Sequence, residues 1–398
     1  MSAALPLAEA QAELLKLAEP LPVEQVDTAS ALGRYLAAPL NARRTQPPAD
    51  LSAMDGYALA DAGRTSWRVI GESAAGHPFA GPLDPGEAVR ISTGAVVPGG
   101  ADAVFLQEDA ARDGETLGIA GDPPRAGRHI RRAGFDFREG DRLLEAGARI
   151  GPAALALAIS AGHASLPVRR RPEVAIIDSG DELASDPADC SPHQIPASNG
   201  PMLQAMLSAL PCVTRRLGPI PDRRDALAQA LDEAKTCDLI VTSGGASVGD
   251  HDLIRPALAD WGAEIAFWRV AMKPGKPLLV ARRGRQLVLG LPGNPVSSFV
   301  TGFLFLLPLA RALLGAASPL PQSCHALLGA SLPQGGKRLE FLRARWDGEH
   351  VVPLAEQDSS GLNALAESNA LIERPAGAAA LGAGAPVRIF PLQPAAVA

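Results

Sequence analysis

Residues 238–252 read DLIVTSGGASVGDHD. The apolar run at 238–241 is typical of a short buried strand, and it leads directly into a Ser-Gly-Gly turn at 243–245. Glycine permits positive φ and lets a ligand approach the main chain closely. Two carboxylates, Asp250 and Asp252, follow at once. Backbone N–H donors beside acids that can hold a hard cation suit a metal-bound phosphate ester, so this stretch predicts a ligand loop at the end of a strand.

The same loop contains the pattern G-x-S-x-G at 245–249, which also marks the nucleophile elbow of α/β-hydrolases. The elbow serine, here Ser247, has to lie on a turn directly between strand and helix, but two residues separate the strand from the pattern. His325 and His350 follow, yet neither has a recognisable triad context. A serine hydrolase using Ser247 is therefore the minor alternative.

The composition of the chain limits the classes of function. Its 398 residues are enough for about two to four domains, and a hydrophobic content of 47% supports packed cores. A net charge of −6 argues against a general nucleic-acid binder. The four cysteines form no CxxC pair, so neither a zinc site nor a disulfide framework is expected.

No signal peptide or membrane span is expected. Residues 1–18 are typical of an amphipathic helix, and the strongest apolar stretch, at 299–307, is too short to cross a bilayer. We therefore expect a cytoplasmic protein with no membrane partner.

Helical spacing of Ala and Leu predicts helix through residues 1–40. The segment 50–133 is rich in Gly, Pro and short β-like runs, which predicts a β-rich module. A helix is predicted at 152–161, with Pro152 in its first turn and Gly162 as its C-terminal cap. The segment 319–398 is predicted to form a small β domain.

Between residues 171 and 315 predicted strands and helices alternate, which indicates a mostly parallel sheet covered on both faces. Such sheets bind ligands beyond the carboxyl ends of their strands. The loops at 179–182, 243–252 and 291–295 each follow a predicted strand, so we expect all three to lie at one edge. Predicted strands are 174–178, 212–217, 239–242, 263–270, 278–281 and 287–289; predicted helices are 202–210, 222–234, 253–260 and 294–307, the last ending before Pro308.

Taken singly, the other motifs have ordinary interpretations beside functional ones. The Asp-Gly pair at 55–56 is typical of a turn, and Ser-Thr-Gly at 92–94 of a strand end. Asp181 and Glu182 either cap the next helix or hold Mg²⁺. The segment 291–298 opens a helix, with Asn294 as N-cap, and can also form an anion site.

The segment at 273–277 places two lysines on a stiff loop. It is not a Walker A loop, because no Ser or Thr follows and the upstream glycine spacing is absent. It is either a solvated turn or a clamp for phosphate or another oxyanion.

Six motifs occur in an ordered series: SAMDGYA at 52–58, STGA at 92–95, SGDEL at 179–183, SGGASVGD at 243–250, KPGKP at 273–277 and LPGNPVS at 291–297. Their order and spacing strongly resemble the molybdopterin molybdenumtransferases, the MoeA and gephyrin E-domain family. The resemblance runs from about residue 5 to 392.

The resemblance implies a multi-domain α/β protein. Residues 1–45 and 134–170 would form a helical and extended linker domain, and 46–133 the β-rich domain. Residues 171–318 would form the central, mostly parallel α/β molybdopterin-binding domain, and 319–398 a C-terminal β-barrel domain. The family is homodimeric, with the active cleft between the α/β domain of one subunit and the β-rich domain of the other.

The implied reaction inserts molybdate into adenylylated molybdopterin, with Mg²⁺-dependent cleavage of the pyrophosphate link and release of AMP. The implied metal ligands are Glu182, Asp222 and Asp252. The implied catalytic residues are Asp55, Thr93, Glu182, Asp252, Lys273 and Lys276. The implied substrate-binding residues are Ser179, Gly180, Asp181, Asn199, Ser243, Gly244, Gly245, Ser247, Arg269, Pro292, Gly293, Asn294, Pro295 and Ser297.

The chain departs from the family pattern at 195–199, where an aspartate usual before the Ser-Asn pair is missing although Asn199 is kept. Arg269 stands where lysine is frequent, which alters the geometry of any contact it makes. Further implied partners are other proteins of molybdenum cofactor synthesis and apo-molybdoenzymes. A non-catalytic molybdopterin-binding scaffold is the other alternative, and the retained acids and lysines argue against it.

Overall fold

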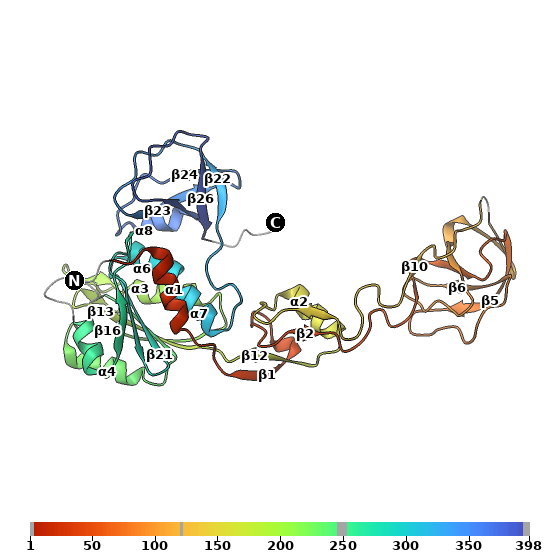
Figure 1. Ribbon diagram of the computed structural model, residues 1–398, viewed down its shortest axis with the longest axis horizontal. Coiled ribbons are helices and arrows are strands. Elements are labelled where there is room, and N and C mark those ends of the chain that lie inside the picture. Colours follow the sequence, from red (N-terminus) through yellow and green to blue (C-terminus); the bar gives the residue numbers. More distant parts are fainter. Residues whose placement is uncertain (1–3, 120–121, 245–252, 393–398) are drawn as a thin grey trace.

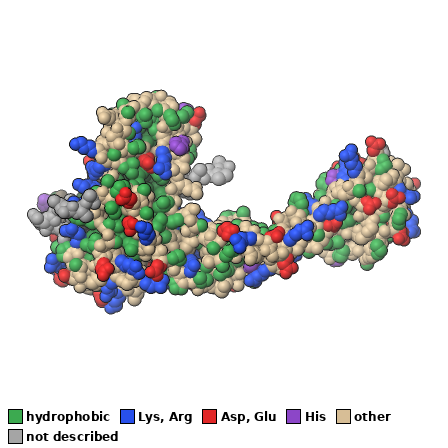
Figure 2. All heavy atoms as spheres, viewed as in Figure 1, with side chains coloured by type: hydrophobic (Ala, Val, Ile, Leu, Met, Phe, Trp, Pro, Cys, Tyr) green, Lys and Arg blue, Asp and Glu red, His purple; other side chains and the backbone are tan. Residues whose placement is uncertain are grey.

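The computed structural model describes residues 4–119, 122–244 and 253–392. The chain forms an elongated molecule (Figure 1). A β-rich body stands at one end, a linking body lies in the middle, and an α/β body with a C-terminal barrel beside it forms the other end. On the face drawn in Figure 2, the described Lys and Arg side chains are interspersed with Asp and Glu along the whole length.

The β-rich body is a six-stranded sheet in the order β7-β4-β6-β5-β9-β8. Strand β4, which lies between β7 and β6, is buried at all four positions, because apolar clusters cover both faces of the sheet. A Cβ at Gly56 would collide with the carbonyl oxygen of Phe105, so only glycine fits beside the neighbouring strand. The elements are β3 (Leu51–Ser52), β4 (Gly56–Leu59), β5 (Ser66–Ser73), β6 (Glu87–Ile91), β7 (Ala103–Leu106), η2 (Gln107–Asp109), β8 (Ala110–Asp113), β9 (Thr116–Ile119) and β10 (Ile130–Arg131).

The linking body is crossed twice by the chain, which pairs β1 with β12 and β2 with β11. Pro152 lies in the first turn of its helix and Gly162 follows that helix with φ 92°, as predicted. Its elements are β1 (Val23–Asp27), η1 (Thr28–Ser30), β2 (Leu40–Asn41), β11 (Arg142–Leu144), α2 (Pro152–Ser160) and β12 (Ser165–Arg169).

The prediction of helix through residue 40 is wrong beyond the first helix, α1 (Leu7–Leu17). Pro20 and Pro22 follow the helix and cannot donate the backbone hydrogen bonds that would continue it. The next residues instead form β1, which pairs with a strand about 140 residues away in the chain. That partner is invisible to any local pattern.

The α/β body contains a six-stranded sheet in the order β16-β13-β17-β21-β20-β18. Strands β16, β13, β17 and β21 are parallel to one another. Strand β20 runs opposite to them and pairs antiparallel with both β21 and β18, so the expected, mostly parallel sheet is present. Helices α1, α3, α6 and α7 pack on one face, and α4 and α5 on the other. The elements are β13 (Glu173–Ser179), β14 (Leu183–Ala184), β15 (Ile195–Pro196), α3 (Asn199–Leu207), β16 (Val213–Ile220), α4 (Arg224–Glu233), β17 (Leu239–Ser243), α5 (Ile254–Asp260), β18 (Glu264–Trp268), β19 (Met272–Lys273), β20 (Leu279–Arg283) and β21 (Gln286–Leu291).

The long helix of this body does not end before Pro308, which corrects the prediction. It runs through α6 (Pro295–Thr301), a π-helical segment η3 (Gly302–Leu306) and α7 (Leu307–Leu313). Pro308 lies in the first turn of α7, where its missing N–H is tolerated. Gln11 of α1 donates from Nε2 to the carbonyl oxygen of Leu304 at 2.9 Å, which satisfies a carbonyl of the π-helical segment.

This run is also the one stretch among the described residues that is helical, long and apolar enough to cross a membrane. It is 78% buried inside the protein, against the sheet and α1. That burial is typical of the core helix of an α/β sheet.

The C-terminal barrel is closed. Its strands follow in the order β23-β24-β22-β26-β25, and β25 pairs back with β23. Strand β19 of the α/β body adds to β23 in parallel, so the two bodies share a backbone pairing. The elements are β22 (Cys324–Leu328), β23 (Leu339–Trp346), β24 (His350–Pro353), α8 (Leu362–Glu367), β25 (Ala370–Arg374) and β26 (Pro386–Pro391).

Candidate functional site

The three predicted ligand loops begin at one edge of the α/β sheet, as expected from the sequence; of the loop at 243–252 the structure describes Ser243 and Gly244. Strands β13, β17 and β21 are parallel neighbours, so the loops after them leave from the same edge. Asn199 Nδ2 donates to Ser243 Oγ at 2.8 Å and to the carbonyl oxygen of Gly293 at 2.7 Å, which ties two of the loops to the start of α3. Gly244 has φ 96°, and a Cβ there would collide with the carbonyl oxygen of Ser179. The predicted site residues Gly245, Ser247 and Asp252, and the neighbouring Asp250, lie outside the described residues.

The acids after β13, Asp181 and Glu182, form a tight turn that the Leu183 N–H closes by donating to the Gly180 carbonyl at 3.1 Å. Ser179 Oγ donates to Asp222 Oδ1 at 2.5 Å, and the Asp222 N–H donates to Asp181 Oδ1 at 3.1 Å. The short strand β14 follows the turn, so neither Asp181 nor Glu182 caps a helix. A Cβ at Gly180 would lie 2.6 Å from Glu182 Oε2, so this carboxylate folds back over the turn.

The donor set of this turn suits Mg²⁺ in its chemistry. Carboxylate oxygens are the ligands that Mg²⁺ prefers, and it is commonly held by one or two of them together with substrate phosphates. Within residues 4–119, 122–244 and 253–392, no group of three or more His, Cys, Asp or Glu side chains forms a ready-made metal cluster. Glu182 and Asp222 could therefore contribute ligands, and the phosphates of a substrate would have to complete the shell.

Asp178, which no sequence motif marks as a site residue, is a buried carboxylate near the end of β13. Burial raises its pKa to about 6, while Arg216 and the Gly200 N–H oppose that rise by favouring the charged form. Arg216 Nη2 lies 3.8 Å from Asp178 Oδ2. A Cβ at Gly200 would overlap that same oxygen, so glycine is required at the start of α3. An acid within an otherwise apolar predicted strand was the signal available in the sequence.

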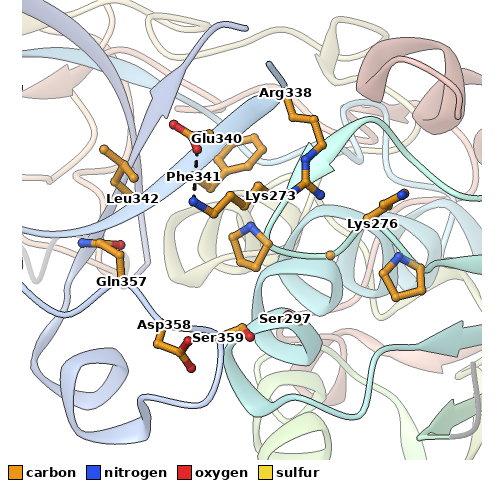
Figure 3. Close-up of a pocket in the computed structure, with 13 residues that line it drawn as sticks. Lys273, Lys276, Ser297, Arg338, Glu340, Phe341, Leu342, Gln357, Asp358 and Ser359 are labelled. Carbon is orange, nitrogen blue, oxygen red and sulfur yellow. Dashed lines mark hydrogen bonds and ion pairs between the residues drawn. The ribbon is translucent and has the colours of Figure 1, made fainter. Parts of the chain in front are cut away.

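A cavity of about 500 Å³ lies between the α/β body and the C-terminal barrel (Figure 3). Lys273 and Lys276 line it from the segment that begins at β19. Lys273 Nζ is 3.3 Å from Glu340 Oε1 of β23, whereas Lys276 extends to the other side (Figure 3). Gly275 between them has φ 102°. The other lining residues are Pro274, Gly275, Pro277, Ser297, Arg338, Phe341, Leu342, Gln357, Asp358 and Ser359.

The charged side chains in this cavity are three cations and two anions. The cations are Lys273, Lys276 and Arg338, and the anions are Glu340 and Asp358. Both the N–H and the Oγ of Ser360 donate to Asp358, which holds the pKa of that carboxyl below its usual range. The cavity therefore carries a net positive charge beside neutral hydroxyl donors, an arrangement that suits an oxyanion.

The barrel side of this cavity was missed by sequence reasoning. Arg338, Glu340, Asp358 and Ser359 stand in short β-like runs and loops, without a motif of their own. They reach the lysines only because β23 pairs with β19, across about 65 residues of chain.

The helix start at 291–297 also contributes to the cavity. Pro295 lies in the first turn of α6, as expected, and Ser297 lines the cavity. Asn294 precedes the helix but makes no capping bond with its side chain; Nδ2 donates instead to Ser359 Oγ at 2.7 Å. Asn294 thus occupies the N-cap position, as predicted, but its side chain contacts the barrel instead of capping the helix. Pro292 belongs to the same loop and connects β21 to Gly293.

Arg269 is not among the lining residues of the cavity. It has φ 79°, and its guanidinium lies 3.9 Å from the centroid of the Trp268 ring. The structure thus places it against an aromatic face rather than beside the two lysines.

Asp55 and Thr93 lie in the β-rich body, where the Thr93 N–H donates to Asp55 Oδ1 at 2.7 Å. Both residues are exposed. That body stands at the far end of the molecule from the α/β body (Figure 1), so a single chain does not bring them to the lysines or to the loops of the sheet.

The chain matches three family descriptions in succession. They are the MoeA N-terminal region (domain I and II) at residues 5–162, the probable molybdopterin binding domain at 175–312, and the MoeA C-terminal region (domain IV) at 325–392.

Curated relatives and solved structures cover nearly the whole chain. A molybdopterin molybdenumtransferase of Haemophilus influenzae is 34% identical over 379 residues, covering 92% of this chain and 94% of that one. One of Bacillus subtilis is also 34% identical, over 92% of this chain and 89% of that one. The crystal structure of the molybdopterin biosynthesis moeA protein of Pyrococcus horikoshii OT3 superposes with a TM-score of 0.85 at 27% identity, covering 98% of this chain and 100% of that one.

Proposed function

The chain belongs to the molybdopterin molybdenumtransferase family, and from that membership we propose that it inserts molybdenum into molybdopterin with the oxyanion held in the lysine cavity. It is a transferase of molybdenum cofactor biosynthesis. The observation that carries the proposed site is the set of three cations and the hydroxyl groups of Ser297 and Ser359 around one cavity. A small tetrahedral dianion such as molybdate matches this set in charge and in hydrogen bonding.

Lys273 and Lys276 act in this proposal as point charges on a constrained loop. Glu340 pairs with Lys273, so it holds that ammonium in place before the oxyanion arrives. The half-buried carboxylate of Glu340 also weakens nonspecific binding of anions in the cavity, because an incoming anion has to compete with it for Lys273.

The adenylylated molybdopterin would lie along the three loops at the edge of the sheet. The Ser243 hydroxyl and the helix start after Gly293 offer donors suited to phosphate oxygens. Ser179 Oγ and the Gly180 N–H already donate to Asp222 and to the Ile220 carbonyl, and they hold the metal-binding acids in place. Glu182 and Asp222 would hold Mg²⁺ together with those phosphates. Bound there, the metal ion would neutralise the pyrophosphate and polarise the bond whose cleavage releases AMP.

A homodimer completes the proposed site. The pair Asp55 and Thr93 lies at the opposite end of the same chain, so these residues can contribute only to the cleft of a second copy. We place this dimer in the cytoplasm, where its substrates would be small molecules supplied by other proteins of the same biosynthesis.

The proposal is tested by molybdenum insertion from molybdate into adenylylated molybdopterin, measured as AMP release and metal content of the product. Lys273→Ala should bind the adenylylated substrate but lose insertion, whereas Lys235→Ala, an exposed lysine paired with Asp232, should retain it. Wild-type turnover by Lys273→Ala would refute the assignment of the cavity. Binding without turnover by the wild-type chain would instead indicate a scaffold.

The dimer is tested by mixing two inactive variants. A mixed dimer of Asp55→Ala and Lys273→Ala chains has one cleft with both residues intact, so random re-association should restore roughly a quarter of wild-type activity. No recovery after subunit exchange would contradict the shared cleft.

A further inference from the structure

Arg343 of β23 is a buried cation whose acceptors are backbone carbonyls. It is 1% exposed. Nη1 donates to the carbonyl oxygens of Asp358 at 2.9 Å and Gly361 at 3.3 Å, and Nη2 donates to that of Glu356 at 2.8 Å. Burial lowers the pKa of this guanidinium, and the carboxylates of Glu356 and Asp358 oppose that effect.

All three acceptors belong to one loop, 356–361, which lies between β24 and α8 and carries three lining residues of the cavity, Gln357, Asp358 and Ser359. The loop docks on the start of α6. The carbonyl oxygen of Ser359 accepts from the Val296 N–H at 3.0 Å, and Ser359 Oγ accepts from Asn294 Nδ2. The position of the loop 356–361 therefore determines the distance between the hydroxyl groups of Ser359 and Ser297.

The opposite wall of the cavity, which carries Lys273, is also held by β23, but through strand pairing and an ion pair. Lys273 of β19 lies opposite Glu340 of β23 in the register of the sheet and pairs with its carboxylate. One barrel strand thus supports the lysine wall by strand pairing and the loop wall through Arg343. Figure 3 shows Lys273 and Glu340 on one side and Asp358 and Ser359 on the other.

The energetic cost of this arrangement argues against simple filling of space. A buried guanidinium is expensive to desolvate, and its Nε has no hydrogen-bond partner among the described atoms. An apolar side chain of similar volume would pack there without that cost. What the guanidinium adds is a rigid fork that reaches three carbonyls of one loop at once, which neither methionine nor lysine can do.

We propose that Arg343 is a positioning residue of the oxyanion cavity, which fixes the loop 356–361 and so holds Ser359 in the cavity wall beside the start of α6. The identity of the oxyanion as molybdate rests on the proposed function. The effect on the loop does not.

The chain offers a matched control in Arg374 of β25. This second buried arginine of the barrel is 3% exposed and donates from Nη2 to the carbonyl oxygens of Pro333 and Ala379, neither of which lines the cavity. Replacing it by methionine removes a buried cation and its carbonyl bonds but leaves the loop 356–361 untouched.

The experiment compares Arg343→Met, Arg343→Lys and Arg374→Met in the full chain. Hydrogen exchange of the backbone amides at 356–361, measured without any ligand, should be at least tenfold faster in Arg343→Met and unchanged in Arg374→Met. The KM for molybdate should rise roughly 10- to 100-fold in Arg343→Met, with kcat at saturating molybdate and the KM for adenylylated molybdopterin little changed. Arg343→Lys, which keeps the charge but not the fork, should give intermediate values.

Equal effects of Arg343→Met and Arg374→Met on the loop or on the KM would overturn the proposal, because both would then report lost stability alone. Unchanged exchange in Arg343→Met would overturn it as well. If that variant does not fold, Arg343→Lys decides by the same exchange measurement. If the wild-type chain shows no molybdate-dependent turnover, the proposed function fails, while the exchange data still decide the role of Arg343.

Discussion

Replacing Asp178 by asparagine should make the protein more stable at neutral pH and should leave its stability nearly unchanged in acid. The carboxylate is 2% exposed, and burial raises its pKa from the ordinary 3.8 to about 6. The asparagine side chain would keep the shape of the original one and an oxygen that accepts from the Gly200 N–H, but it would carry no charge. The substitution Asp178→Asn therefore isolates the cost of burying a carboxylate.

The sign of the stability difference follows from the raised pKa of Asp178, and its size follows from how far that pKa is raised. Below pH 3.8 the carboxyl is protonated in both the folded and the unfolded chain, and it imposes no penalty. Between pH 3.8 and 6 the unfolded chain binds fewer protons than the folded one, so stability falls as the pH rises. Above pH 6 the penalty is constant, and at about 1.36 kcal/mol per pH unit it amounts to about 3 kcal/mol.

The assay is urea unfolding of both proteins at about pH 5, 6, 7 and 8, followed by hydrogen exchange of β13 so that the α/β body is monitored by itself. The stability difference in favour of Asp178→Asn should grow from about pH 5 to pH 7 and then level off. Asp225→Asn is the control of opposite sign, because Arg223 holds the pKa of Asp225 below its usual value. A difference for Asp178→Asn that does not vary with pH would refute the reasoning.

Three further substitutions test separate parts of the structure. Gly275→Ala places a Cβ on a residue with φ 102°, 2.5 Å from Thr301 Cγ2. It should destabilise the chain by about 1–3 kcal/mol, measured by thermal unfolding, and should weaken molybdate binding, measured by calorimetry. Gln11→Leu leaves the Leu304 carbonyl without its donor and should cost about 1–3 kcal/mol, whereas an unchanged melting temperature would deny that bond a role in supporting the π-helical segment. Lys276→Ala should raise the Kd for molybdate roughly tenfold with no loss of stability, and equal weakening by Lys235→Ala would contradict the cavity as the binding site.

The α/β body could be predicted because its signals are local. The strands β13, β17 and β21 are short, mostly apolar runs, and a loop of small or acidic residues follows each of them. Parallel strands then require those loops to start at one edge, and the hydrogen bonds of Asn199 to Ser243 and Gly293 show that they do.

Two helix boundaries were predicted wrongly from the sequence, and the structure shows why. The helix expected through residue 40 gives way to β1, because two prolines and a distant strand outweigh the helical spacing of Ala and Leu. The helix expected to stop at Pro308 continues, because a π-helical segment moves the proline into a first turn and Gln11 satisfies a carbonyl there. Both outcomes depend on contacts across the fold rather than on the residues alone.

By itself the sequence determined the fold class, the ligand loops of the sheet and the two lysines of the 273–277 segment, since each of these depends on residues close together in the chain. Only the tertiary structure decided what those lysines face. Arg338, Glu340 and Ser359 become part of the cavity through the pairing of β19 with β23, and Arg343 acquires its role through a loop folded back over its own strand. The same holds for Asp55 and Thr93, which the extended linking body carries away from the rest of the site. Side chains brought together by long-range pairing leave no periodic or short-range pattern in a single sequence, and this is the physical reason that they could not be found there.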